Sequence, residues 1–134
     1  MFDLAIIGGG PAGYTAAERA AQSGLTVVLF EKKQLGGVCL NEGCIPTKTM
    51  LYSAKLYHNA QNSSKYGITL DNLAFDYEKI VARKNKIVRK LNAGIRTKMA
   101  ENSITLVNGE ASIESATNHI EIACNSELFE AKNV

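Results

Sequence analysis

Short apolar runs alternate with a helical pattern at the start of the chain. Residues 2–7 and 26–30 are apolar and β-branched, and runs of this length are typical of strands buried on both faces of a parallel sheet. Residues 14–23 form a small-residue helical pattern between them, with Pro11 in the first turn and Gly24 after the end, where helices favour these residues. The pattern therefore predicts a βαβ unit.

The rest of the chain predicts two helices, a third strand and a meander. Residues 49–61 form a helical pattern, and residues 66–74 are expected to be irregular, with room for a brief extended segment at 68–70. Asp76 is placed to cap a long helix that continues to Glu101, and Gly94 weakens that helix locally. A third parallel strand is expected at 103–107. A small antiparallel meander follows, with short alternating runs at 111–114, 120–123 and 128–131.

Length and composition indicate one α/β domain. A chain of 134 residues with 46% hydrophobic and 21% charged content can bury one core and is too short for two ordinary domains. No apolar run approaches the roughly 20 residues of a membrane span. The amino terminus also lacks the basic start and long apolar core of a signal peptide, so we expect a cytoplasmic protein without a membrane partner.

Basic residues are concentrated on the long helix, with no acidic residue between them. The segment has no recognisable nucleic-acid motif and no aromatic residue after Tyr77, so we expect no nucleic-acid partner. A solvated or intersubunit helix face is the better interpretation. The basic residues are Lys79, Arg83, Lys84, Lys86, Arg89, Lys90, Arg96 and Lys98.

A glycine turn follows the first strand and completes the pattern G-x-G-x-x-G. Gly8 permits the tight turn, Gly10 lets a pyrophosphate approach the backbone, and Gly13 lets the helix pack closely on the sheet. The helix amino terminus offers N–H groups and a partial positive charge to phosphates. Glu31 ends the second strand, where it can accept a hydrogen bond from a ribose hydroxyl. These features predict a dinucleotide site, and a tight turn without a ligand is the alternative.

Two thiols lie between a glycine pair and a proline. In a regular helix Cys39 and Cys44 would be about 7.5 Å apart along the axis and on different faces. A disulfide needs Cα atoms within about 6.8 Å, so the pair can close only if the backbone leaves helical geometry near residues 41–43. Pro46 suits a first helical turn, which places Cys44 near a helix start, where the helix dipole and Lys48 favour a thiolate. Cys39, nearer the loop, is expected to be the more accessible sulfur.

Two other interpretations of the thiols stay open. Both can be small buried hydrophobic residues, which is the usual place of a lone cytosolic cysteine. A metal site would need Cys124, His58 or His119 as further ligands, but these are distant and the spacing is atypical, so no metal is expected. We expect Cys124 to pack in the meander.

Residues 8–13, Glu31 and above all the stretch 36–48 together resemble the amino-terminal FAD domain of the class I pyridine nucleotide-disulfide oxidoreductases. The resemblance covers the whole chain, because the long helix, third strand, turn at 108–111 and meander follow in the family's order. The cysteine stretch is most similar to the members that oxidise dihydrolipoamide. Members that act on glutathione or mercuric ion more often carry Val after the first cysteine and a different residue before the lysine.

The resemblance implies FAD as the cofactor of this domain. Gly8, Gly10 and Gly13 would receive its pyrophosphate, and Glu31 its adenosine ribose. The other residues implied to line the cofactor are Pro11, Ala12, Lys32, Gly36, Gly37, Val38, Cys39, Cys44, Lys48, Gly109 and Ala111.

Three side chains are implied to be catalytic. Cys39 would be the interchange thiol that meets the substrate, Cys44 a charge-transfer thiolate facing the flavin ring, and Lys48 a stabiliser of the reduced flavin. In the family, electrons pass from dihydrolipoamide on a lipoyl carrier protein to the disulfide, then to FAD, and then as hydride to NAD.

The family's NAD-binding domain, dimerisation domain and catalytic His–Glu pair have no counterpart in these residues, and neither His58 nor His119 has the family's surrounding pattern. We therefore expect residues 1–134 to be a truncated FAD domain of a homodimeric enzyme, inactive alone. A non-catalytic FAD-binding module and a glutathione-type or mercuric-type reductase are alternatives. A plain NAD dehydrogenase domain would leave the cysteine stretch without a purpose.

Overall fold

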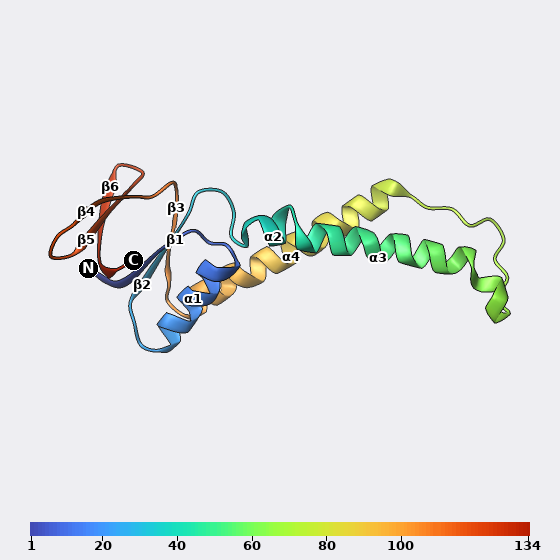
Figure 1. The fold of residues 1–134 in the computed structure, drawn as a ribbon, viewed down its shortest axis with the longest axis horizontal. Helices are drawn as coiled ribbons and strands as arrows, with labels where there is room; N and C mark the ends of the chain where they lie inside the picture. Colours follow the sequence, from blue (N-terminus) through green and yellow to red (C-terminus); the bar gives the residue numbers. More distant parts are fainter.

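A six-stranded sheet forms the body of the protein, and the computed structural model describes all residues 1–134 (Figure 1). The strands are β1 (Phe2–Ile7), β2 (Val27–Glu31), β3 (Thr105–Asn108), β4 (Ser112–Ala116), β5 (Ile120–Cys124) and β6 (Glu127–Asn133). Their order is β3-β2-β1-β6-β5-β4. The first three pair in parallel and the last three form an antiparallel meander. The α/β class and the meander are confirmed. The meander also joins the sheet, because β6 pairs in parallel with β1.

The opening βαβ unit folds as predicted. Helix α1 (Pro11–Gln22) connects the first two strands, with Pro11 at its start and Gly24 in the left-handed region after its end. β2 is buried along almost its whole length, but β1 is mostly half-buried, so the prediction that it is buried on both faces is wrong. Its carboxyl end borders a cavity, where Ile7 stays 45% exposed.

Two long helices form an arm that extends away from the sheet (Figure 1). Helix α3 (Cys44–Gln61) follows the short α2 (Gly37–Asn41), and α4 (Tyr77–Glu101) returns to the sheet. The predicted cap is confirmed, because the Asp76 side chain accepts a hydrogen bond from the backbone N–H of Lys79 at 3.0 Å. α4 continues through Gly94, and most of its basic side chains are exposed.

Two predicted boundaries are wrong. The apolar pattern began the second helix at Thr49, but α3 begins at Cys44, in agreement with the first-turn position predicted for Pro46. The irregular segment is confirmed from residue 67 to residue 74, where no helix or strand forms, and a short 3-10 helix, η1 (Ser63–Tyr66), precedes it. β3 begins two residues later than predicted, because Ser103 has a positive φ of 55° at the end of α4.

The sheet separates two apolar cores. On one face Leu29 belongs to a cluster with Ala17 of α1 and Met99 of α4. On the other face Val28 and Phe30 cluster with meander residues such as Cys124, whose predicted packing role is confirmed. Successive strand residues point to opposite faces, so β2 supplies both cores. The helices therefore cover one face of the parallel strands, and the meander covers the other.

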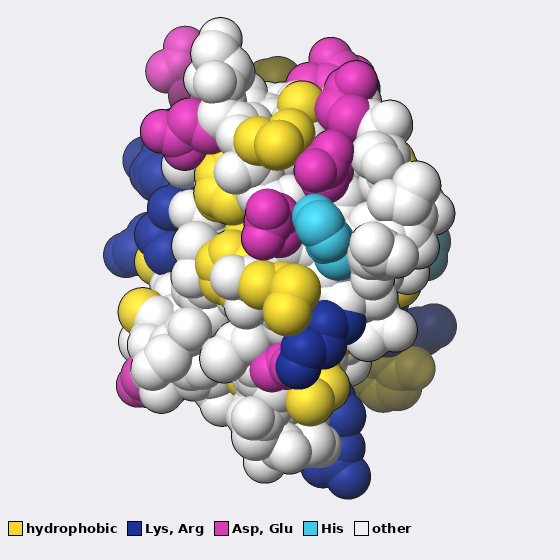
Figure 2. Space-filling view, turned by 90° about the vertical axis from the view of Figure 1, so that its left-hand side faces the viewer, with side chains coloured by type: hydrophobic (Ala, Val, Ile, Leu, Met, Phe, Trp, Pro, Cys, Tyr) yellow, Lys and Arg dark blue, Asp and Glu magenta, His cyan; other side chains and the backbone are white.

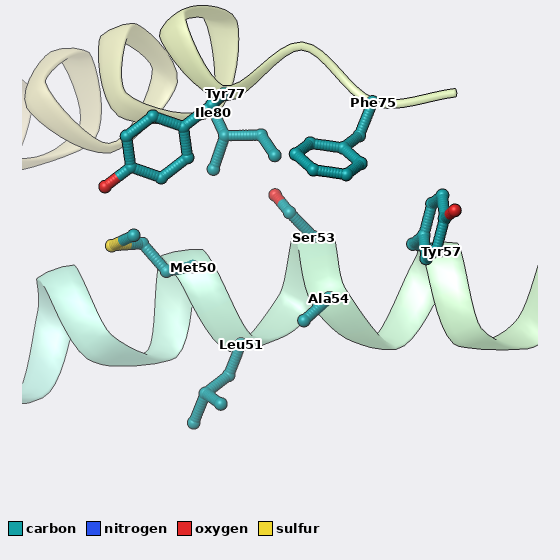
Figure 3. A pocket seen from close by; sticks show the side chains of 8 residues that line it. All are labelled: Met50, Leu51, Ser53, Ala54, Tyr57, Phe75, Tyr77 and Ile80. Atoms are coloured by element: carbon teal, nitrogen blue, oxygen red, sulfur yellow. The ribbon is translucent and has the colours of Figure 1, made fainter.

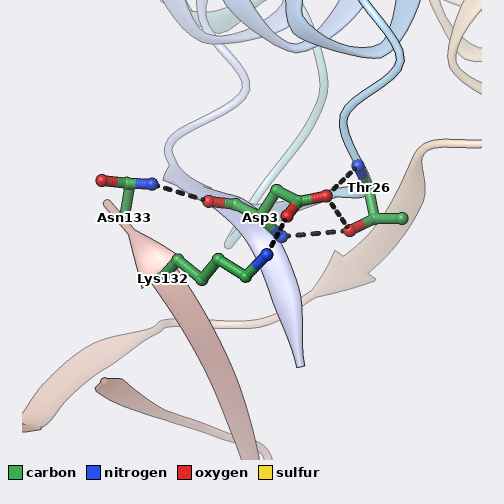
Figure 4. Close-up of polar contacts among 4 residues, drawn as sticks. All are labelled: Asp3, Thr26, Lys132 and Asn133. Carbon is green, nitrogen blue, oxygen red and sulfur yellow. Dashed lines mark hydrogen bonds and ion pairs between the residues drawn. The ribbon is translucent and has the colours of Figure 1, made fainter. Parts of the chain in front are cut away.

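A polar network ties the first strand to its two neighbours (Figure 4). The Asp3 carboxylate accepts hydrogen bonds from the Thr26 N–H at 2.9 Å and hydroxyl at 2.7 Å, and it pairs with the Lys132 ammonium at 2.7 Å. The Asn133 amide donates to the Asp3 carbonyl at 3.0 Å. The hydrogen bond from Lys132, followed by those from Thr26, holds the pKa of Asp3 well below its usual range. The network joins β1 to the start of β2 and to the end of β6.

None of the helices combines the length and the apolar composition needed to cross a membrane.

Candidate functional site

The glycine turn between β1 and α1 is shaped by close backbone packing. Gly8 has a φ of +108°, which favours glycine, and a Cβ atom at Gly13 would overlap the Gly8 carbonyl oxygen. α1 can therefore approach β1 only because residue 13 has no side chain. Gly10 precedes the first helical residue without a side-chain capping hydrogen bond, so no side chain covers the N–H groups of the first turn.

The glycine turn and the cysteine segment are in direct contact. The Gly36 N–H donates to the Gly9 carbonyl at 2.8 Å. Gly37 has a positive φ of 59°, and a Cβ atom there would lie 2.9 Å from the Cα of Gly10. Any side chain at residue 37 would therefore push the two backbones apart. The structure thus brings together two glycine motifs that are well separated in the sequence.

Glu31 lies at the carboxyl end of β2 and faces the glycine turn. Its carboxylate accepts hydrogen bonds from the backbone N–H groups of Gly9 at 2.8 Å and Lys33 at 2.7 Å. Two carboxylate oxygens can accept about four hydrogen bonds, so capacity remains for a ligand. The Glu31 carbonyl also accepts from the Gly109 N–H at 3.0 Å, which joins the end of β3 to this corner.

Three cavities surround this corner and are lined by most of the predicted cofactor-binding residues. A cavity of about 200 Å³ contains Gly8, Glu31, Lys32, Gly109 and Ala111 in its lining. A second, of about 450 Å³, is lined by Gly8, Gly10, Pro11, Ala12 and Gly13. A third, of about 310 Å³, is lined in part by Glu31, Lys32, Gly37 and Val38. These residues therefore form one region at the carboxyl ends of the parallel strands, whereas Gly36, Cys39, Cys44 and Lys48 line none of the three cavities.

A salt bridge closes one side of this region. Lys32 donates to Glu110 with an N–O distance of 2.8 Å. The hydrogen bond raises the pKa of Lys32 and lowers that of Glu110. Both side chains are more than half exposed, so the pair contributes little to stability.

The two thiols lie on either side of a break between α2 and α3. Cys39 is in α2, and Cys44 is the first residue of α3. Gly43 separates the helices with a non-helical backbone, and a Cβ atom there would lie 3.3 Å from the Cα of Cys39. The predicted departure from helical geometry and the position of Cys44 at a helix start are therefore confirmed.

The accessibility of the two sulfurs is the reverse of the prediction. Cys44 is exposed, whereas Cys39 is half-buried in α2, which packs against α3 and α4. Interaction with the Cys44 side chain, followed by burial, raises the pKa of the Cys39 thiol, and the Lys48 charge acts in the opposite direction. The largest influence on the Cys39 thiol is thus its neighbour Cys44.

The histidines are distant from the thiols. His119 lies in the meander, with its Nε2 3.5 Å from Glu121 and 3.6 Å from Glu130, and acidic side chains surround a histidine on this end of the molecule (Figure 2). His58 lies on α3 in the outer part of the arm. No group of three or more His, Cys, Asp or Glu side chains is placed to hold a metal ion.

The most apolar cavity of the protein lies away from the thiols and glycines. It occupies about 380 Å³ between α3 and α4, where Met50, Tyr57, Phe75 and Ile80 are part of its lining (Figure 3). None of the predicted site residues lines it. This cavity belongs to the packing of the arm and not to the candidate site.

Sequence reasoning missed the polar contacts that hold the cysteine segment to α4. Asn92 of α4 and Asn41 of α2 share hydrogen bonds with each other and with the Leu35 carbonyl. One signal in the sequence could have revealed these contacts. Asn92 is a polar residue on the apolar stripe of a helix, between Val88 and Ile95.

The fold and the glycine turn define the class of the protein as an α/β domain of the Rossmann type, in which the segment that bears two cysteines contacts the turn through its glycines. The model of the pyridine nucleotide-disulphide oxidoreductase family matches residues 2–133, and the chain belongs to this family.

Relatives with a named activity support the same assignment. The chain is 43% identical over 134 residues to the dihydrolipoyl dehydrogenase of Acholeplasma laidlawii, covering 99% of this chain and 39% of the relative. It is 48% identical over 108 residues to the dihydrolipoyl dehydrogenase of Zymomonas mobilis, covering 81% of this chain and 23% of the relative. The chain thus spans well under half the length of these curated relatives.

A solved structure shares the fold. The crystal structure of LpdA from Mycobacterium tuberculosis superposes with a TM-score of 0.87 at 24% identity, over 96% of this chain and 30% of that one. At this identity the likeness concerns the fold alone.

Proposed function

We propose that this chain is the FAD-binding and redox-disulfide portion of an enzyme that oxidises dihydrolipoamide with NAD as the final acceptor. The observation that carries the proposal is the direct backbone contact between the glycine turn and the segment that bears Cys39 and Cys44. A dinucleotide held by the glycine turn would lie beside this thiol pair. The names of the relatives in Acholeplasma laidlawii and Zymomonas mobilis support the substrate.

The residues at the corner of the sheet fit the parts of FAD. The uncapped start of α1 and the close Gly10–Gly37 contact leave room for phosphates against the backbone. The Glu31 carboxylate suits a ribose hydroxyl, and the cavity beside Gly109 and Ala111 suits the adenosine end. When bound, FAD would supply the hydride-transfer chemistry that no side chain of this protein offers.

The thiol pair would exchange with the substrate. In the oxidised pair a substrate thiolate attacks the Cys39 sulfur, the bond between the two cysteines breaks, and Cys44 leaves as a thiolate. The second substrate thiol then closes the substrate disulfide and releases Cys39. Two electrons pass from the substrate to the cysteine pair, one of the two substrate protons stays on Cys39, and the other goes to solvent.

Electrostatics supports these different tasks for the two sulfurs. The raised pKa of Cys39 favours the proton on this thiol, as the exchange requires. The exposed Cys44 stands at the positive end of α3, and its exposure suits a sulfur that a cofactor covers. Lys48, one helical turn further, adds a positive charge.

The remaining partners rest on the family and on the length of the relatives. NAD, a lipoyl carrier protein and a second copy of the polypeptide would be bound by residues outside these 134, in a cytoplasmic homodimer. The acid–base residues for the exchange would also come from outside, because neither histidine of this chain lies at the thiols. This chain alone would therefore not turn over.

Absorbance spectroscopy and turnover assays test the proposal on the whole protein. We expect flavin absorbance, a long-wavelength band after two-electron reduction, and turnover with dihydrolipoamide and NAD but not with glutathione or mercuric ion. Cys39→Ser should abolish turnover and retain the flavin, while Cys124→Ala, a cysteine outside the site, should stay active. A protein without flavin, or a Cys39→Ser variant with full activity, would contradict the proposal. Preference for glutathione or mercuric ion would assign a different branch of the family.

A further inference from the structure

A buried amide interrupts the apolar stripe of α4. Asn92 is only 6% exposed and lies near Ile95 and Met99, which belong to the core cluster on the helical face of the sheet. Burying an amide is costly unless it is hydrogen-bonded. A leucine of similar size would fill the same space without this cost. The presence of asparagine therefore needs a reason beyond packing.

The Asn92 side chain reaches the start of the cysteine segment. Its Nδ2 donates to the Leu35 carbonyl and, at 3.1 Å, to Oδ1 of Asn41. The Asn41 amide group in turn donates to the carbonyls of Leu35 at 3.0 Å and Gly37 at 2.9 Å. The two asparagines thus form one network with the backbone carbonyls that precede Cys39, and Asn41 joins this network from the residues that follow Cys39.

The helix that carries Cys39 depends on such contacts. α2 has five residues, far below the roughly 12–15 that an isolated helix needs to be marginally stable. Its preceding residue, Gly36, is left-handed with a φ of 96° and provides no side-chain cap. Tertiary contacts must therefore hold α2 in place, and the network from Asn92 is the polar part of them.

We propose that Asn92 is a positioning residue that acts through Asn41 to hold the Cys39 helix against α4, and so sets how Cys39 approaches Cys44. This role rests on the proposed function only in the claim that the two cysteines are the redox pair. The placement of Cys39 itself depends on the network whatever the substrate or cofactor.

The variant Asn92→Leu tests this role, and Met99→Ala is its matched control. Leucine keeps the number and branching of side-chain heavy atoms at residue 92 and removes the amide, so α2 loses its anchor while the core stays filled. Met99, 1% exposed on the same helix, belongs to the same core cluster, but its side chain makes no hydrogen bond to the cysteine segment. Its truncation weakens the helix packing without removing the network. Asn41→Ala is a second variant that breaks the network from the half-buried side.

The measurement is the alkylation rate of Cys39 in the reduced whole protein, followed by peptide mass spectrometry across pH. In Asn92→Leu we expect the rate to rise about tenfold, the factor that corresponds to the net value of one hydrogen bond. The pH midpoint should fall toward that of an ordinary thiol, because the Cys44 contact and the burial that raise the pKa of Cys39 are both loosened. Asn41→Ala should act in the same direction, and the double variant should add little, since both residues belong to one network.

Two results would overturn the proposal. One is an Asn92→Leu variant whose Cys39 rate and pH midpoint match the unmodified protein within about twofold. The other is a Met99→Ala variant that changes both by as much, because loss of helix packing alone would then explain the effect. If Asn92→Leu does not fold, an unchanged Asn41→Ala profile decides against the proposal.

The same samples separate this proposal from the proposed function. Flavin absorbance and dihydrolipoamide turnover of the unmodified protein decide the function, whereas the variants are compared through thiol chemistry alone. A protein without flavin whose Cys39 still responds to Asn92→Leu would refute the function and retain the positioning role. An active flavoprotein in which neither variant changes the alkylation rate of Cys39 would support the function and refute the positioning role.

Discussion

The sheet and the helical arm are stabilised in different ways. Leu29 and Phe30 in the centre of the sheet are 0% and 1% exposed, because helices cover one face and the meander the other. In the arm, Leu51 and Leu56 of α3 remain 62% and 52% exposed. The glycine turn belongs to the sheet, and Cys44 begins the arm. The candidate site therefore joins a well-buried region, the sheet, to a more exposed region, the arm.

Truncating one leucine in each region is the strongest test of this difference. Leu29→Ala should lower the free energy of unfolding by about 2–5 kcal/mol, since it leaves a cavity between two packed layers. Leu56→Ala removes the same atoms from an exposed position and should stay within about 0.5 kcal/mol. Urea denaturation of the two variants measures both values, and equal losses would show that the arm is packed as tightly as the sheet.

Two helical glycines should respond with opposite sign to the same change. Gly13→Ala should destabilise by about 1–3 kcal/mol, because the new methyl group would meet the Gly8 carbonyl. At Gly94 nothing lies within 4 Å of the position that a Cβ atom would occupy, so Gly94→Ala should stabilise α4 by about 0.5–1 kcal/mol. Thermal unfolding of the two variants measures the sign of each change in stability. A destabilised Gly94→Ala variant would mean that this face of α4 is covered in solution.

The carboxylates of Asp3 in the sheet and Asp76 in the arm should give the smallest effects, because their hydrogen bonds lie at the surface. Hydrogen bonds, from Lys132 and Thr26 to Asp3 and from Lys79 to Asp76, lower both pKa values. A lowered folded-state pKa adds stability that is present above the unfolded value of about 3.9 and is lost as pH falls through the folded value.

Asp3→Asn and Asp76→Asn should therefore each reduce stability at pH 7 and flatten its decline below about pH 4. Denaturant titrations at pH 7 and pH 3 provide the comparison. The Asp3 variant should lose more, because Asp3 links three strands while Asp76 caps one helix end. A larger loss of stability in the Asp76 variant would show that the arm depends on its carboxylate more than the sheet does.

Local pattern was sufficient for most of the fold. The apolar runs, the glycine turn and the Asp76 cap each specify structure within a few residues, so the βαβ unit and the long helix could be placed from sequence. Whether the segment at 68–70 forms a strand could not be decided from sequence, because an extended run becomes a strand only when another strand lies beside it. The pairing of β6 with β1 also joins residues more than a hundred positions apart, which no local pattern encodes.

For the site, the sequence by itself determined which chemical groups are present and how they are spaced. It placed a glycine turn after the first strand, an acidic residue at the end of the second strand, and two thiols near a helix start. These placements follow from residue type, because backbone freedom and helix geometry depend on it. Only the tertiary structure decided that Gly37 contacts Gly10, that Cys44 is more exposed than Cys39, and that Asn92 reaches the cysteine segment. Exposure and long-range hydrogen bonds depend on which elements pack together, and that packing is a property of the whole chain.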